Sequence, residues 1–138
     1  MLNSNSARFL ALGVAGVAVV SATVAGVAIA ADPTPTVKAP YAQAAAAVKA
    51  DGTATKKTDT VASVSRVDTG RYCVALDADV DVKRSVPVAT LQGAADWKSE
   101  IYVTPEANKC GGAGSQKVLV TTAADGTAKN QAFHILIP

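Results

Sequence analysis

From residue 61 onward, apolar and polar residues alternate along the chain in short runs. A period of two is typical of half-buried β-strands, because successive side chains of a strand point to opposite faces of a sheet. No strong helical period follows residue 60, so we expect an all-β fold, either a small antiparallel sandwich or a partly open barrel. The alternation predicts six strands, at residues 61–67, 71–76, 85–92, 100–104, 116–122 and 130–137.

Two of the breaks between these runs carry Asp and Gly. The sequence Asp68-Thr69-Gly70 separates the first two predicted strands, and it predicts a hairpin because Gly adopts the positive φ that tight turns need. A second turn signal, Asp125-Gly126, lies between the last two predicted strands.

A different pattern occupies the first thirty residues. Arg8 is followed by an uncharged run over residues 9–31, which contains the small-residue triplet Ala28-Ile29-Ala30 near its end. This order predicts a signal peptide, residues 1–30, cleaved after Ala30. The run is also long enough to cross a bilayer, so a retained membrane anchor over residues 9–31 is the alternative. In both cases we expect the rest of the chain to be secreted or held at the cell surface.

Residues 31–59 are rich in Pro, Ala and Thr, and we predict that they form a flexible linker. Pro33 and Pro35 disfavour a helix and favour an extended spacer. The alanine-rich stretch over residues 41–50 has helix propensity but too few large apolar side chains to dock firmly. The folded β domain is therefore expected to span residues 60–138.

Cys73 and Cys110 are the two cysteines of the chain. Two cysteines in a small exported chain normally form a disulfide, which here would stabilise the fold by roughly 4 kcal/mol on the loop-entropy model. A redox or zinc site is the alternative, but the chain has no Cys-x-x-Cys motif and too few Cys and His ligands for zinc. We predict a structural disulfide that pins the long excursion carrying Trp97.

The charge balance argues against a nucleic-acid partner. All but one of the 13 basic residues and all 11 acidic residues follow residue 30, so this part of the chain is nearly neutral. Its basic clusters are no larger than the pairs Lys56-Lys57 and Lys83-Arg84, and nucleic-acid binding needs a basic patch or stripe. We expect contact with a membrane only through an uncleaved leader.

His134, the one histidine, lies in the last predicted strand on the face opposite Phe133 and Ile135. A hydrolase using His134 as a base would need a nucleophile and an orienting carboxylate beside it. No Gly-x-Ser-x-Gly motif accompanies the histidine. We therefore predict a surface or backbone-bonded strand histidine and no catalytic residue, with a secreted hydrolase as the alternative.

Asp77, Asp79 and Asp81 are spaced by two, as on one face of a strand or in a cation-binding loop. The run lacks the Gly and the Glu that a helix-flanked calcium loop places at its sixth and twelfth positions. We predict a solvated strand end, no metal and no cofactor. The Gly-rich run over residues 110–115 lacks the strand–loop–helix context of a phosphate-binding loop and is predicted to be a flexible loop.

Trp97 and Tyr102 are the candidates for contact with a partner. Exposed aromatic side chains of a β-sandwich can stack on sugar rings or anchor a protein interface. Because the domain has few large side chains, we expect Trp97 to fill one end of the core. The alternative is that both aromatics meet a cell-wall glycan or a protein.

Several segments together are similar to small uncharacterised secreted all-β proteins of high-GC Gram-positive (actinobacterial) bacteria. The segments that carry this likeness are 64–76, 118–122, 125–127 and Phe133-His134. The likeness covers about residues 61–137, and it implies a fold and a compartment but no activity. This chain departs from that pattern, since Cys73 lies inside the second strand and the C-terminus has no cysteine.

We therefore expect an exported, non-enzymatic β domain that presents its loops to a cell-envelope or extracellular partner. The alternatives are the secreted hydrolase described above and an adhesion or phage-tail-like binding module.

Overall fold

The structure is a computed structural model that describes residue 39, residues 41–93 and residues 97–138. The predicted signal peptide and the first part of the predicted linker lie outside these residues. The chain divides into two units, residues 1–31 and 32–138, and all described residues belong to the second. In the described part of the chain, no helix is long and apolar enough to cross a membrane.

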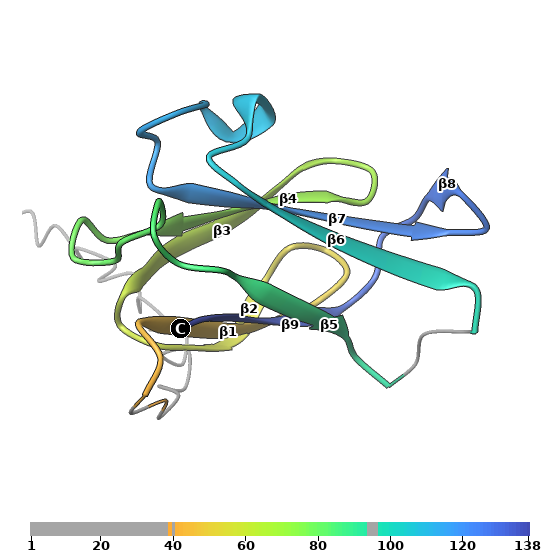
Figure 1. The fold of residues 1–138 in the computed structure, drawn as a ribbon. Helices are drawn as coiled ribbons and strands as arrows, with labels where there is room; N and C mark the ends of the chain where they lie inside the picture. The colour runs from red at the N-terminus through yellow and green to blue at the C-terminus, as the bar shows by residue number, and fades with distance from the viewer. Residues whose placement is uncertain (1–38, 40, 94–96) are drawn as a thin grey trace, which may run out of the picture. The chain divides into compact units, whose positions relative to one another are not determined.

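The described residues form two antiparallel β-sheets that pack together without closing into a barrel (Figure 1). This confirms the predicted all-β fold, as a sandwich. The four-stranded sheet has the order β2-β1-β9-β5, with β1 Ala44–Val48, β2 Ala54–Lys57, β5 Val88–Leu91 and β9 Phe133–Ile137. The second sheet has the order β3-β4-β7-β6, with β3 Val61–Asp68, β4 Arg71–Leu76, β6 Ser99–Pro105 and β7 Lys117–Ala124, and the short β8 Thr127–Ala128 pairs with β7.

Each of the six predicted strands corresponds to an observed one, namely β3, β4, β5, β6, β7 and β9. Gly70, with φ of 65°, turns β3 into β4 as predicted. Asp125 and Gly126 also have positive φ, at 50° and 71°, as expected for a tight hairpin turn. That turn joins β7 to β8, and the chain then crosses to the other sheet to form β9.

The prediction of a flexible linker over residues 31–59 is wrong for the stretch that forms β1 and β2. Strand β1 lies inside the four-stranded sheet, where Ala46 pairs with Lys57 on one side and with Ile135 on the other. Ala44 and Ala46 are buried in the core. Tertiary pairing and burial outweigh the helix propensity of the alanine run, so the folded domain begins well before residue 60.

The apolar core lies between the two sheets. The rings of Tyr72 and Phe133 pack at its centre with centroids 5.1 Å apart. Val80 and Val82 lie in the connection between β4 and β5, where the chain passes from one sheet to the other, and both are buried. The core is therefore completed by a loop as well as by strands.

A buried polar network joins both sheets. The hydroxyl of Tyr72 donates to the main-chain oxygen of Ala50 at 2.9 Å and accepts from the main-chain N–H of Gln131 at 3.2 Å. The side-chain amide of Gln131 donates to Ala123 at 2.7 Å and accepts from the hydroxyl of Ser99 at 2.7 Å. Because these buried groups have partners, they avoid the cost of an unpaired donor or acceptor.

Candidate functional site

Cys73 and Cys110 form the predicted disulfide. Cys73 lies on β4 between Tyr72 and Val74, whose side chains are fully buried in the core. Since side chains alternate along a strand, Cys73 points to the outer face of the five-stranded sheet. Cys110 ends the one-turn helix η1 Asn108–Cys110 in the connection from β6 to β7, so the disulfide holds this connection over that outer face (Figure 1).

The stretch between the two cysteines carries Trp97, but the disulfide fixes this stretch at Cys110 rather than near Trp97. Trp97 precedes β6, whereas Cys110 follows it. The seven residues of β6 span roughly 23 Å at about 3.3 Å per residue, so the two positions lie near opposite ends of the strand.

The connection between β6 and β7 is ordered by hydrogen bonds of its own. The carboxylate of Glu106 accepts from the N–H of Gly114 at 2.6 Å, and the oxygen of Ala107 accepts from Gly112 at 3.0 Å. Glu106 and Gln116, at the two ends of the connection, have positive φ values of 48° and 50°. Such a backbone costs about 1–2 kcal/mol per non-glycine residue and persists only where the surroundings enforce it.

The three aspartates at 77, 79 and 81 lie in the loop after β4, not on a strand. Asp81 forms an ion pair with Arg84, which holds the pKa of that carboxyl below its usual value. The valines between and beside the aspartates point into the core, so the alternation reflects a core-filling loop. Among the described residues, no group of three or more His, Cys, Asp or Glu side chains is placed to hold a metal ion.

His134 lies on the exposed face of β9, opposite the buried Phe133 and Ile135, as the alternation predicts. Its cross-strand neighbours are Ala47 on β1 and Thr90 on β5. Neither neighbour supplies the carboxylate that would orient a catalytic imidazole.

The expectation that Trp97 fills the core is wrong, because its side chain is fully exposed. The buried valines at 80 and 82 help to fill the core instead. Tyr102, on the outer face of β6, is 57% exposed. Both aromatics predicted as possible partner contacts are therefore accessible, one just before β6 and one at its middle.

Polar contacts fix the surroundings of these two aromatics. One carboxylate oxygen of Glu100 accepts from the hydroxyl of Tyr102 at 2.7 Å, and the other accepts from the N–H of Gly126 at 3.1 Å. The hydrogen bond and the negative charge of Glu100 raise the pKa of Tyr102. Lys98 forms an ion pair with Asp125 at 3.1 Å, and its main-chain oxygen accepts from the N–H of Asp125 at 3.1 Å. These contacts and the hydrogen bond of Glu100 join the start of β6 to the turn between β7 and β8.

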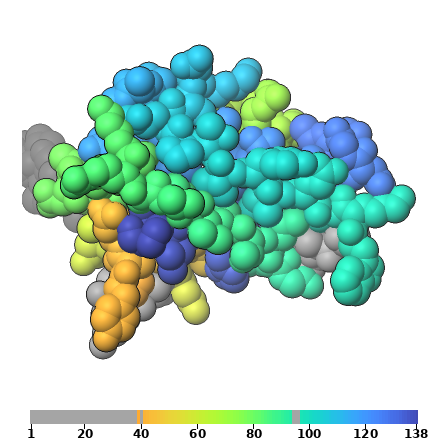
Figure 2. All heavy atoms as spheres, viewed as in Figure 1, coloured from red at the N-terminus to blue at the C-terminus, as the bar shows by residue number. Residues whose placement is uncertain are grey.

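A pocket of about 240 Å³ lies near the other end of β6. It is lined by residues from two loops, Asp81, Val82, Lys83, Glu106, Gly114 and Gln116. Figure 2 shows the green 77–92 stretch and the cyan 97–116 stretch, which supply these loops, side by side on one face.

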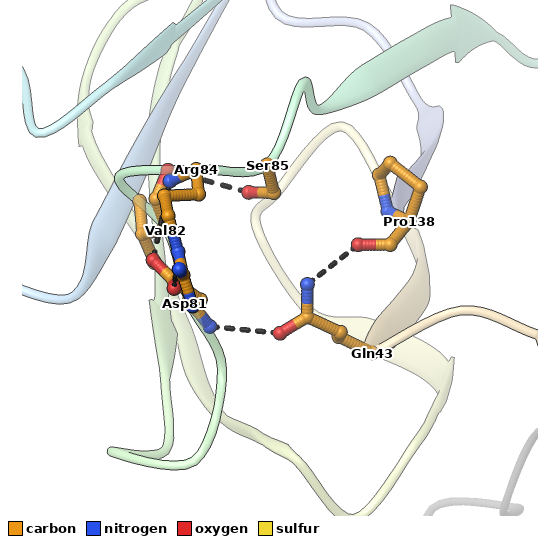
Figure 3. A network of polar contacts seen from close by, with 6 residues as sticks. All are labelled: Gln43, Asp81, Val82, Arg84, Ser85 and Pro138. Carbon is orange, nitrogen blue, oxygen red and sulfur yellow. Dashed lines mark hydrogen bonds and ion pairs between the residues drawn. The ribbon is translucent and has the colours of Figure 1, made fainter.

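Gln43 holds the first of these loops against the four-stranded sheet (Figure 3). Its side-chain oxygen accepts from the N–H of Asp81 at 2.8 Å, and its side-chain nitrogen donates to the main-chain oxygen of Pro138 at 2.6 Å. The hydroxyl of Ser85 donates to Val82 at 3.3 Å within the same loop. One glutamine thus joins β1, the end of β9 and the loop between the sheets.

Sequence reasoning missed four residues of this end of the sandwich, Gln43, Lys83, Glu106 and Gln116. Gln43 falls in the stretch assigned to a linker, and no local signal distinguishes it. Glu106 and Gln116 flank the Gly-rich run that follows Cys110, and the disulfide was the one available hint that this run is held in place.

Comparison with known proteins found no matching family model, no matching curated protein and no matching solved structure.

Proposed function

We propose that the protein is an exported, non-enzymatic domain that binds an extracellular polysaccharide through Trp97 and Tyr102. The full exposure of Trp97 carries the proposal. Among the described residues the buried aromatics are Tyr72 and Phe133, so the core contains few large side chains. Trp97, the largest side chain, is nevertheless exposed to solvent. Tryptophan is mostly buried in folded proteins and is enriched at binding surfaces when it is not.

The surroundings of the two rings favour a sugar over a protein. The core of a protein interface is depleted of charged residues, whereas Lys98, Glu100 and Asp125 lie beside these aromatics. The faces of aromatic rings carry negative charge density, which attracts the C–H groups of a pyranose ring. The nearby charged groups can hydrogen-bond sugar hydroxyls, as a polyhydroxylated ligand requires.

Preorganisation adds to the argument. Glu100 holds the hydroxyl of Tyr102 and the backbone at Gly126 at the same time. A side chain already fixed in the free protein loses less conformational entropy when a ligand binds.

Export rests on the predicted leader together with the disulfide between Cys73 and Cys110. Disulfides persist in oxidising compartments and are rare in the cytosol, so the pair is compatible with an extracellular location.

The fluorescence of Trp97, the chain's single tryptophan, provides the test. The protein is titrated with purified peptidoglycan fragments and with neutral hexose polysaccharides. We expect saturable quenching or a spectral shift with at least one of them. In a pull-down on the insoluble polymer, Trp97→Ala weakens binding by about tenfold, which corresponds to a loss of about 1.4 kcal/mol of binding free energy.

Tyr41→Ala is the matched control, because Tyr41 is equally exposed but lies on the other sheet's side of the domain, beside Leu136 of β9. Polysaccharide binding that Tyr41→Ala weakens as much as Trp97→Ala contradicts the proposal. Failure of every glycan to bind, together with saturable binding of an envelope protein at Trp97, assigns the surface to a protein partner instead.

A further inference from the structure

The pocket between the 77–85 loop and the connection from β6 to β7 is small and polar. Its volume of about 240 Å³ is below the roughly 300–1,000 Å³ of pockets that hold drug-sized ligands. Four of its lining residues have polar side chains: Asp81 and Glu106 carry carboxylates, Lys83 carries an ammonium group and Gln116 carries an amide. A ligand that fits this space is about the size of one sugar unit.

Both walls of the pocket are held in place in the free protein. One wall is anchored by the buried Val82 and by the hydrogen bond from Asp81 to Gln43 (Figure 3). The other wall is anchored by the disulfide at Cys110 and by the hydrogen bond between Gly114 and Glu106. Because the loops of this pocket are already ordered in the free protein, little conformational entropy is lost when a ligand binds.

The polar groups of the pocket differ in whether they already form hydrogen bonds or ion pairs within the protein. Asp81 is paired with Arg84, and one oxygen of Glu106 accepts from Gly114. Among the described residues, the side chains of Lys83 and Gln116 form no hydrogen bond or ion pair. The pocket therefore offers free donors at Lys83 and Gln116 and free acceptors at Gln116 and Glu106.

The same set of groups argues against other ligands. Lys83 would repel a metal ion or an amine, and the two carboxylates would repel an anion. A purely apolar ligand would leave these polar groups without water or partners. A neutral molecule with many hydroxyls matches donors and acceptors of both kinds.

We propose that this pocket binds a single neutral sugar of hexose size. The site is separate from the Trp97 surface and does not depend on it, because the two lie toward opposite ends of β6.

Nuclear magnetic resonance of the full-length, ¹⁵N-labelled disulfide-bonded protein provides the test. Glucose, galactose, mannose and N-acetylglucosamine are added separately up to about 50 mM, because a ligand of this size binds with a Kd on the order of 1 mM. We expect saturable shifts of the backbone amides of Lys83, Gly114 and Gln116 with at least one of these sugars.

Four variants test whether the shifts arise from the pocket. Lys83→Ala and Gln116→Gly each weaken binding by about fivefold or more, as expected for a lost hydrogen bond. Glycine suits the positive φ of residue 116, so Gln116→Gly removes the amide without straining the fold. Lys109→Ala, on the same connection but outside the pocket lining, leaves affinity unchanged, as does Trp97→Ala.

Three results would overturn the proposal. They are the absence of saturable shifts at these amides with all four sugars, tighter binding of glucosamine or glucuronate than of any neutral sugar, and equal weakening by Lys109→Ala and Gln116→Gly. Loss of glycan binding at Trp97 with retained shifts at Gln116 would instead contradict only the function proposed above.

Discussion

The main-chain oxygen of Gly70 accepts a hydrogen bond from the N–H of Thr122 at 2.8 Å, and the two backbones approach too closely for any side chain at residue 70. A Cβ atom there would overlap the main-chain oxygen of Thr122 and lie 3.0 Å from the nitrogen of Lys129. The N–H of Gly70 also donates to the side chain of Asn130 at 2.7 Å. The turn between β3 and β4 is thus held against the neighbouring chain by hydrogen bonds and close backbone contacts.

Gly70→Ala is expected to destabilise the domain by about 3 kcal/mol or more, because the positive φ and the steric overlap both oppose it. Gly126→Ala is the control, since it has a similar φ of 71° but nothing within 4 Å of the added atom. It should cost only about 1–2 kcal/mol. Urea unfolding of both variants measures the difference, and equal losses would show that the close contact with Thr122 has no energetic effect.

Removal of the disulfide by Cys73→Ala/Cys110→Ala should lower the free energy of unfolding by roughly 4 kcal/mol on the loop-entropy model, given a separation of 37 residues. Because the disulfide lies on the outer face and not in the core, hydrogen exchange should increase first in the connection from β6 to β7. Thermal melting and amide exchange test both parts. A double variant that melts like the wild type would refute the prediction.

The position of β1 makes the domain dependent on residues before 60. A chain that begins at Asp32 should fold, whereas a chain that begins at Thr60 should not, because it lacks the strand that lies between β2 and β9. Circular dichroism and limited proteolysis distinguish the two chains. A protease-resistant domain formed from residue 60 onward would show that β1 is dispensable.

Burial raises the pKa of Tyr72 above its ordinary value of 10.0. The folded protein therefore keeps this proton where the unfolded chain has lost it, so stability is full below about pH 10 and falls as the pH rises through the folded-state pKa. Tyr72→Phe should remove this alkaline loss. The variant should also cost about 1–3 kcal/mol at neutral pH, because Ala50 and Gln131 each lose a hydrogen-bond partner.

Denaturant unfolding between pH 7 and pH 11 compares Tyr72→Phe with Tyr41→Phe, which changes an exposed ring. An alkaline loss of stability that persists unchanged in Tyr72→Phe would assign it to other groups.

Cleavage of the predicted signal peptide after Ala30 would leave a mature N-terminus at Ala31. Mass spectrometry of the culture supernatant should find the chain without residues 1–30. Recovery of the intact chain in the membrane fraction would favour the anchor over residues 9–31 instead.

The apolar side chains of β3 to β7 and β9 were enough to predict these strands, because each strand packs apolar residues against the core, although those of β3, β5 and β6 are mostly only partly buried. The same signal fails for β1, where alanines occupy both faces and their pattern resembles a helix former. Only the partners of β1 reveal it as a strand, and one of them, Ile135, is about ninety positions away. Local sequence does not contain that pairing.

Some features of the candidate site could also be predicted from the sequence, whereas others depend on the tertiary structure. The disulfide follows from the cysteine count, but its place on the outer face depends on the register of β4. Large side chains are scarce, so the sequence predicts that Trp97 lies in the core. Val80 and Val82 instead fill part of the core from a loop, where they alternate with aspartates and give no strand signal. Gln43 and Gln116 become neighbours of the pocket only through tertiary folding.

The pairing of β1 with β9 also has a consequence for how the domain acquires its structure. The first strand of the described chain, β1, cannot complete its pairing before the last strand, β9, is present, since Ala44 pairs with Ile137 and Val48 with Phe133. During synthesis, a nascent chain therefore holds β1, β2 and β5 of its four-stranded sheet before β9, the strand that joins β1 to β5, has been made. Contacts of such large sequence separation slow folding, and the pairing of β1 with β9 cannot form until residues 133–137 have been synthesised.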